Sequence, residues 1–400
     1  MSVAGVRPLN PGATLLHIGL PKTGTTAVQA AAAQLRGPLL EQGVCYPGIA
    51  LNHGTASNAL MGRSTAVFEA GPRARWERIA DELRSHPDAI GWLSYEQIAQ
   101  ATPAVARRFL DELGPDLHVV ITARAYVSVL PSAWQQWVKD AGDAPFETWI
   151  ARVLDVRDRE GGTEGSGPGT GFWRQHDLPA IARVWADLLG PERVHVVILD
   201  KSRPALLFDA FEGLLALEPG TLASAPRDAL LSNRGMSRAE AELAQGVNAL
   251  AHAAAAPVDP RVYYRVMRNG AISAVLRDRE PTQDEGSIAA SAPLAARFAH
   301  EGAAAARALA GLGVDVVGDL EALGALPGNP PAEAPAPCAA VDPELAALAV
   351  LGATSAALGE GVNFAGARLP GGEPVAGPGR PSRRAVLGAL RRRARRAVAR

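Results

Sequence analysis

Short apolar runs, separated by stretches of helix length, mark the first two thirds of the chain. Buried strands are predicted at Thr14–Gly19, Gly43–Tyr46, Ile90–Ser94, Leu117–Thr122 and Val194–Leu199. A helix is predicted directly after the first strand, over Thr25–Arg36. Apolar, β-branched runs that alternate with helices are typical of a parallel β-sheet flanked by helices on both faces. We therefore expect an α/β fold, with functional residues beyond the carboxyl ends of the strands.

The pattern changes near residue 237, where Ser237 precedes a stretch with separate apolar and polar faces. A mainly helical part is predicted from there. We expect one domain over 12–326 that includes this helical part, then a Pro/Ala-rich linker over 327–343. A short helix with a Gly/Pro-rich segment over 344–379 and an Arg-rich tail over 380–400 complete the chain. The glycine-rich residues 161–171 are predicted to form a surface loop.

Charge is unevenly distributed over the 400 residues, although the formal net charge is only −1. Residues Arg380–Arg400 include nine arginines and no acidic residue, which leaves 31 basic against 41 acidic residues elsewhere. Apolar residues between these arginines predict a basic amphipathic helix that binds an anionic membrane surface peripherally. A disordered tail and non-specific nucleic-acid contact are the alternatives. No specific nucleic-acid partner is expected.

No apolar run is long enough to span a bilayer, and Met1–Pro11 lacks the features of a secretory signal. The two cysteines, Cys45 and Cys338, are too few for a disulfide framework. No His, Cys, Asp and Glu residues have metal-ligand spacing, so no metal is expected. These features predict a cytoplasmic protein, peripheral at the inner membrane face if the tail binds lipid.

A glycine-containing loop, Gly19-Leu20-Pro21-Lys22-Thr23-Gly24-Thr25-Thr26, joins the first predicted strand to its helix. Strand, glycine turn and helix N-terminus together favour anion binding. In P-loop NTPases the lysine directly follows the last glycine. Here Lys22 comes two residues before Gly24. We therefore expect an anion other than a magnesium-bound triphosphate.

The segment "PKTGTT" resembles the 5′-phosphosulfate loop of bacterial sulfotransferases that use 3′-phosphoadenylyl sulfate (PAPS). The resemblance implies a P-loop NTPase-like sulfotransferase fold, with PAPS as donor and 3′-phosphoadenosine 5′-phosphate (PAP) as product. It also implies that Lys22 neutralises charge on the bridging oxygen as the S–O bond breaks. The residues that it implies for the phosphosulfate are Pro21, Lys22, Thr23, Gly24, Thr25 and Thr26. A glycine-rich turn with a surface lysine is the alternative.

A second anion site is predicted for the 3′-phosphate of the donor. Arg124 follows the fourth strand, and Ser132 lies eight residues later, where a helix is predicted to begin after Pro131. An arginine fork with a hydroxyl suits a terminal phosphate, and the pair matches the family's 3′-phosphate motif. Ser128 is a weaker substitute. The alternatives are a surface salt bridge for Arg124 and a helix cap for Ser132.

A third segment, "SNRGMSRAEAEL", also resembles a stretch of the bacterial members. There Asn233, Arg234 and Gly235 would close over the donor. A simple helix entry, with Ser237 as cap, is the alternative.

The acceptor must lose a proton, and family members use a histidine or a glutamate as the base. His53, which follows the second strand, is the first candidate because its ordinary pKa suits neutral pH. Glu96, just past the third strand, is the second. The alternatives are a loop contact for His53 and a cap or ion pair for Glu96. Ser94 is a further donor or acceptor contact, whereas His17, His118 and His195 lie within strands and are predicted to be structural.

These residues predict a PAPS-dependent sulfotransferase that moves a sulfuryl group to a hydroxyl or amine of a carbohydrate or glycolipid. A non-catalytic PAP-binding or scaffold protein of the same fold is the first alternative. A nucleotide-dependent kinase is the second, but it would require a Gly-Lys-Ser/Thr order and a magnesium-binding carboxylate.

Overall fold

The computed structural model describes residues 6–65, 67, 69–160, 170–226, 234–254, 258–326, 328–338 and 340–359. These residues divide into two compact units. The first comprises those within Met1–Gln136, Ala144–Asn233 and Ile288–Ala336, and the second those within Trp137–Asp143, Arg234–Ser287 and Pro337–Arg400. Most of the predicted 161–171 loop and the whole Arg-rich tail lie outside the described residues.

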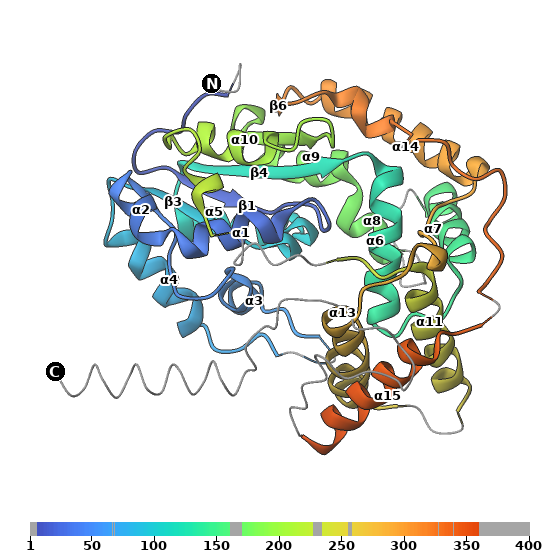
Figure 1. Cartoon of the computed structure of the whole chain (residues 1–400). Helices are drawn as coiled ribbons and strands as arrows, with labels where there is room; N and C mark the ends of the chain where they lie inside the picture. Colours follow the sequence, from blue (N-terminus) through green and yellow to red (C-terminus); the bar gives the residue numbers. More distant parts are fainter. Residues whose placement is uncertain are drawn as a thin grey trace, which may run out of the picture. The chain divides into compact units, whose positions relative to one another are not determined.

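The first unit is built on a six-stranded parallel sheet in the order β2-β3-β1-β4-β5-β6. Strands β1, β3, β4 and β6 of this sheet are labelled in Figure 1. The strands are β1 (Thr14–His17), β2 (Val44–Cys45), β3 (Ile90–Ser94), β4 (Leu117–Arg124), β5 (Val194–Leu199) and β6 (Asp315–Val317). The α/β fold is therefore confirmed, and so are the five predicted strands. The three-residue strand β6 was not predicted, because so short an edge strand has no clear apolar pattern.

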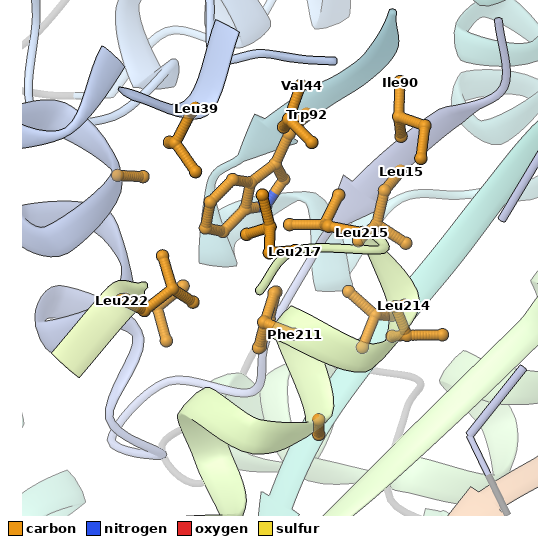
Figure 2. Close-up of a cluster of buried hydrophobic side chains, with 14 of the residues drawn as sticks. Leu15, Leu39, Val44, Ile90, Trp92, Phe211, Leu214, Leu215, Leu217 and Leu222 are labelled. Carbon is orange, nitrogen blue, oxygen red and sulfur yellow. The ribbon is translucent and has the colours of Figure 1, made fainter. Parts of the chain in front are cut away.

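The two faces of the sheet are covered by different helices. Leu15 and Trp92 lie side by side on β1 and β3 and pack with apolar residues of α1 (Thr25–Gln34) and α10 (Leu206–Leu214). Figure 2 shows the Trp92 indole within this cluster. Removing about 200 Å² of indole surface from water is worth on the order of 5 kcal/mol. Helix α9 (Leu178–Leu189) contacts β4 and β5 on the opposite face.

The remaining helices of the first unit surround this sheet. They are α2 (Arg36–Glu41), α3 (Gly54–Met61), α4 (Ala74–Arg84), η1 (Glu96–Gln100), α5 (Pro103–Leu113), α6 (Tyr126–Lys139, which reaches the second unit), α7 (Phe146–Glu160), α8 (Thr170–His176), η2 (Pro191–Arg193), η3 (Leu222–Ser224), α14 (Ala292–Ala310) and η6 (Leu320–Gly324).

The start of helix α6 differs from the prediction. The helix begins at Tyr126, directly after β4, and Pro131 lies inside it. Proline has no N–H to donate to the carbonyl four residues earlier, which is why its position suggested a helix start. Because the helix begins earlier, Ser132 is not a helix cap.

The second unit is helical. Its elements are the last turn of α6, α11 (Arg238–Ala253), α12 (Pro260–Tyr263), the π-helix η4 (Tyr264–Ile272), α13 (Ser273–Asp278), η5 (Gln283–Glu285) and α15 (Pro343–Leu358). Ser237 caps α11, as predicted, in a capping box with Glu240. The close approach of α15 requires Gly352, where an added Cβ would lie 2.6 Å from the Cβ of Ala274.

Candidate active site

The loop after β1 has the backbone of an anion cradle. Lys22 and Gly24 have φ values of 68° and 80°, in the left-handed region, and Thr23 between them does not. Alternation of this kind turns successive N–H groups toward one side of the chain. Helix α1 then begins at Thr25 with no side-chain cap and no acidic residue in its first turn. The partial positive charge of the helix N-terminus is therefore directed into the loop.

Side-chain contacts hold the loop against β4. The Thr23 hydroxyl donates to the Leu20 carbonyl at 2.5 Å and lies 2.7 Å from the Thr122 hydroxyl. The Lys22 ammonium donates to Gln136 Oε1 at 3.1 Å. Gln136 belongs to helix α6. Lys22, which is predicted to bind the phosphosulfate, therefore contacts the same helix that carries Ser132.

Arg124 and Ser132, the predicted 3′-phosphate pair, lie together. Arg124 ends β4, and its Nη2 donates to Ser132 Oγ at 3.0 Å. Ser132 Oγ donates in turn to the Val129 carbonyl at 3.1 Å. The Arg124 Nε is buried and has no hydrogen-bond partner within the part of the chain that the structure describes. The guanidinium thus keeps a buried donor that a bound anion would satisfy.

Helix α6 carries the hydrogen-bond partners of both positively charged residues, Lys22 and Arg124. Ser132 contacts Arg124, and Gln136, four residues later, contacts Lys22. Four residues of α-helix rise by about 6 Å. The partners of Lys22 and Arg124 are therefore spaced by about one turn along the same helix. Gln136 was not predicted, although its position one turn after Ser132 was a usable signal.

His53, the first candidate base, is fully engaged in hydrogen bonds. The Ser94 amide donates to His53 Nδ1 at 3.0 Å, and Nε2 lies 3.0 Å from the Pro47 carbonyl. Because a carbonyl only accepts, Nε2 carries the proton, and the lone pair of Nδ1 is already used. Burial lowers the pKa of His53 to about 4. The ring therefore has no free lone pair that could take a proton from an acceptor.

Glu96, the second candidate, has the accessibility that His53 lacks. It is half-buried at the start of η1, just beyond β3. Gln29 Nε2 donates to Glu96 Oε2 at 3.4 Å, and Asn52 Nδ2 donates to Gln29 Oε1 at 3.4 Å. Gln29 is buried on α1, the helix that follows the anion loop. This amide contact was not predicted, because nothing in the sequence links a glutamine of α1 to the end of β3.

A continuous chain of polar contacts runs from Gln29 to the anion loop. Gln29 Nε2 donates to Ser94 Oγ at 3.0 Å, and Ser94 Oγ lies 2.9 Å from His17 Nδ1. His17 Nε2 lies 3.3 Å from Thr122 Oγ1, which contacts Thr23. His17 is fully buried, and burial lowers its pKa to about 3. Its predicted structural role is confirmed.

The direction of every bond in this chain is fixed. The single hydroxyl proton of Thr23 is donated to Leu20, so Thr122 must donate to Thr23. His17 therefore donates from Nε2 to Thr122 and accepts at Nδ1 from Ser94. A neutral His17, with one N–H and one lone pair, therefore satisfies its hydrogen bonds to both Thr122 and Ser94.

The other two predicted structural histidines also lie where expected. His118 Nδ1 is 3.1 Å from His195 Nε2, and His195 Nδ1 is 2.8 Å from Asp315 Oδ2. The three residues join the amino-terminal parts of β4, β5 and β6. This edge of the sheet is opposite the one that carries the anion loop.

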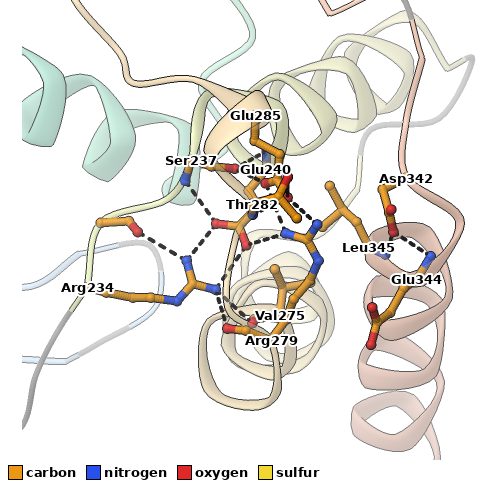
Figure 3. A network of polar contacts seen from close by, with 11 residues as sticks. Arg234, Ser237, Glu240, Val275, Arg279, Thr282, Glu285, Asp342, Glu344 and Leu345 are labelled. Atoms are coloured by element: carbon orange, nitrogen blue, oxygen red, sulfur yellow. Dashed lines mark hydrogen bonds and ion pairs between the residues drawn. The ribbon is translucent and has the colours of Figure 1, made fainter. Parts of the chain in front are cut away.

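The third predicted segment is divided by what the structure describes. Asn233 lies outside the described residues, and Gly235 is exposed in the second unit. Arg234 is held by Glu240, with contacts of 2.7 Å and 2.9 Å, and by the carbonyls of Val275 and Arg279 (Figure 3). In this arrangement the Arg234 guanidinium binds groups of the second unit. Its predicted contact with a donor stays a prediction.

A histidine that the sequence did not single out lies near Lys22 and Arg124. His176, at the end of α8, is buried, and Lys22 and Arg124 both act on its ring electrostatically. The backbone groups that act on it are those of Phe172 and of Pro21, which belongs to the anion loop. No motif surrounds His176 in the sequence, so only the fold could reveal this position.

Comparisons with known proteins add little. No protein-family model matches the chain, and no curated protein matches it. Among solved structures, the chain is similar to a sulfotransferase from Alicyclobacillus acidocaldarius. The identity is 17% and the TM-score 0.38, over 61% of this chain and 96% of that one. At these values the similarity supports no statement about activity.

No helix among the described residues is long and apolar enough to cross a membrane. Within the same residues, no group of three or more His, Cys, Asp or Glu side chains is arranged to hold a metal ion.

Proposed function

We propose that this protein is a PAPS-dependent sulfotransferase. One observation carries the proposal: the Lys22–Gln136 and Arg124–Ser132 contacts lie on successive turns of helix α6, beyond the carboxyl end of the sheet. A donor with anionic groups at both its 5′ and 3′ ends requires two such sites at a fixed spacing. The solved sulfotransferase is too distant to support this argument, which depends on the site residues.

In this mechanism the loop binds the phosphosulfate, and Arg124 with Ser132 binds the 3′-phosphate. Glu96 takes the proton of the acceptor hydroxyl or amine as the acceptor atom forms its bond to sulfur. The bond between sulfur and the bridging oxygen breaks, and PAP leaves with the electron pair. Lys22 and the loop amides stabilise the negative charge that develops on the bridging oxygen.

Polar side chains near Glu96 favour a hydroxylated acceptor such as a carbohydrate or the sugar of a glycolipid. Asn58 Nδ2 donates to the Tyr95 hydroxyl at 3.2 Å, and Arg63 Nη1 donates to Gln97 Oε1 at 3.1 Å. With Asn52, these groups provide donors and acceptors around the carboxylate of η1. A sugar, with several hydroxyls, matches such a surface better than an apolar acceptor does.

Calorimetric titration with PAP tests the donor site. Arg124→Ala is expected to weaken PAP binding about tenfold to a hundredfold, because charge-assisted hydrogen bonds are worth about 1.5–3 kcal/mol. Arg108→Ala is the matched control, since Arg108 is exposed on α5. Absence of PAP binding, or equal binding by Arg124→Ala, would contradict the proposal.

Transfer of labelled sulfate from PAPS to a panel of sugars and glycolipids tests the activity. Lys22→Ala is expected to lower transfer by about 10²–10³-fold, the usual effect of removing one group that stabilises developing charge. A protein that binds PAP tightly, but neither sulfates any panel member nor hydrolyses PAPS, would instead be the non-catalytic alternative.

A further inference from the structure

One ring nitrogen of His176 has no hydrogen-bond partner although it is buried. The side chain is 4% exposed, at the end of α8. Its Nδ1 lies 2.9 Å from the Phe172 carbonyl. Its Nε2 is buried without a partner of normal geometry in the described part of the chain. Buried polar atoms in this condition are uncommon and require an explanation.

The neutral ring is poorly matched to its surroundings. The Phe172 carbonyl only accepts, so in the neutral ring the proton must be on Nδ1 and the lone pair on Nε2. The backbone group nearest the other side of the ring is the carbonyl of Pro21, which also only accepts. Two acceptors therefore flank a ring that has one proton. A doubly protonated imidazolium would satisfy both.

Burial and two cations oppose that second proton. Burial acts most strongly, and Arg124 from β4 and Lys22 from the anion loop add to it, so that the pKa of His176 is lowered to about 4. The nearest acidic groups do not compensate. Asp177, the next residue, is paired with Arg157 of α7 at 2.5 Å. Glu96 of η1, which also packs against α8, is bonded to Gln29.

An anion bound to Lys22 and Arg124 would reverse this balance. It would neutralise the two positive charges that now oppose protonation of His176, while the two carbonyls would remain. Because ligand and proton would then favour each other's binding, the coupling is reciprocal. We propose that His176 takes up a proton from solvent when the anionic groups of the donor occupy the Lys22–Arg124 site, and so becomes a third positive charge of that site. This inference rests on the proposed function.

Calorimetric titration of the full-length chain with PAP measures how many protons are taken up on binding. At about pH 6, the binding enthalpy is measured in MES, bis-Tris and imidazole buffers, whose ionisation enthalpies differ. Its dependence on the buffer gives the number of protons exchanged. His176→Gln is the test variant, because a glutamine amide can donate to Pro21 but does not titrate. His118→Asn is the control, since His118 is also a histidine of low pKa but lies at the other edge of the sheet.

The wild type and His118→Asn are expected to take up more protons than His176→Gln, with a difference of up to about one. Because the phosphates of PAP also exchange protons on binding, the comparison uses the difference between variants and not the total uptake. The PAP affinity of the wild type is also expected to fall as pH rises from about 4, the pKa of His176 in the free protein, to the raised pKa in the complex, by up to about tenfold per unit relative to His176→Gln.

A direct measurement does not depend on the folding of a variant. Long-range ¹H–¹⁵N correlation of the histidine rings is expected to show His176 Nε2 unprotonated in the free protein and protonated in the PAP complex. Equal proton uptake by the wild type and His176→Gln, or an unprotonated Nε2 in the complex, would overturn the inference alone. Absence of any PAP binding heat in the wild type would overturn the proposed function and this inference together.

Discussion

Lys22 adopts a backbone conformation that disfavours any residue with a side chain. Its φ of 68° lies in the left-handed region, where a Cβ costs roughly 1–2 kcal/mol. The neighbouring residues compensate, because Thr23 is bonded to Leu20 and Thr122. A glycine would relieve this strain, but it would remove the ammonium. The conformation is therefore retained at a cost to stability where the side chain has a role.

Two variants of Lys22 separate stability from activity. Lys22→Gly is expected to be more stable than Lys22→Ala by about 1 kcal/mol, because only glycine relieves the left-handed φ. Both are expected to lose sulfate transfer equally, since neither carries the ammonium. Urea unfolding and the labelled-sulfate assay provide the two measurements. Equal stability of the two variants would contradict the strain argument.

Glu96 and His53 are expected to respond differently to substitution. Glu96→Gln should lower transfer by about 10²–10⁴-fold, the usual contribution of a general base. His53→Gln should instead cost about 1–3 kcal/mol of stability, since it disturbs the bonds to Pro47 and Ser94. The folded fraction of His53→Gln should transfer sulfate at a rate within a few-fold of the wild-type rate. A stable but inactive His53→Gln would restore His53 as the base.

Among single residues, the sequence singled out the loop, Arg124 and Ser132 because short motifs carry their chemistry, and their roles toward a donor stay predictions. It could not settle the base, because the partners of His53 come from Pro47 and from Ser94 on another strand. Gln29, Gln136 and His176 were missed for the same reason. Their relevance depends on contacts between residues that are far apart in the sequence.

Among the elements, the start of α11 depends on buried ion pairs. Glu240, almost fully buried, accepts from Arg234 and Arg279, and Arg279 also pairs with Glu285 (Figure 3). Arg279 and hydrogen bonds to Ser237 and Thr282 lower the pKa of Glu285 to about 2. Ser237 contacts both carboxylates. The turn before α11 is thus held by charges that are compensated only as a group.

Glu240→Gln is expected to destabilise the protein by about 3–5 kcal/mol, because it leaves the buried guanidinium of Arg279 and the half-buried guanidinium of Arg234 without full compensation. Urea unfolding measures the loss, and Glu280→Gln is the control, since Glu280 is exposed in the same unit. If Glu240→Gln unfolds at the same urea concentration as the control, the cluster does not stabilise this element.

Element types followed from the sequence more reliably than their boundaries. The central strands are continuous apolar runs, which is the pattern that buried parallel strands require. Helix α6 begins at Tyr126 and not after Pro131, and β6 was missed. A proline inside a helix and a three-residue edge strand are both stabilised by surrounding contacts, which local patterns do not report.

For the whole molecule, three buried histidines link stability to pH, and half-buried His118, whose pKa burial lowers to about 4, acts in the same direction. His17, His53 and His176 have pKa values of about 3, 4 and 4, lowered by burial from 6.5. Each gains a proton more readily in the unfolded chain. Their contribution is therefore complete above pH 6.5 and is lost as pH falls toward their folded values.

Between about pH 6.5 and pH 4, each of these histidines is expected to lower the unfolding free energy by up to about 1.4 kcal/mol per pH unit. Urea unfolding at a series of pH values measures the slope. His53→Gln should reduce it by the share of one proton, whereas His300→Asn, an exposed control, should leave it unchanged. Constant stability from about pH 7 to pH 5 would contradict this linkage.

The domain organisation is the part of the whole molecule that local patterns describe least. A sheet and a helical part are both visible in the sequence, but the chain re-enters the first unit at Ile288 and the second at Pro337. Where the chain passes from one unit to the other depends on which apolar faces pack together, and these faces come from segments that are far apart in the sequence.

The directed chain from Gln29 to Leu20 has an electrostatic consequence. Each N–H or O–H bond in it points toward the anion loop, so its hydrogen, the positive end of the bond dipole, is on the loop side. Aligned dipoles polarise one another and add their fields. The last of these donors is bound to the Leu20 carbonyl of the loop, so the aligned bonds are expected to add to the positive ends that Lys22 and the α1 N-terminus present there. Negative charge beside Lys22 is favoured before any ligand arrives.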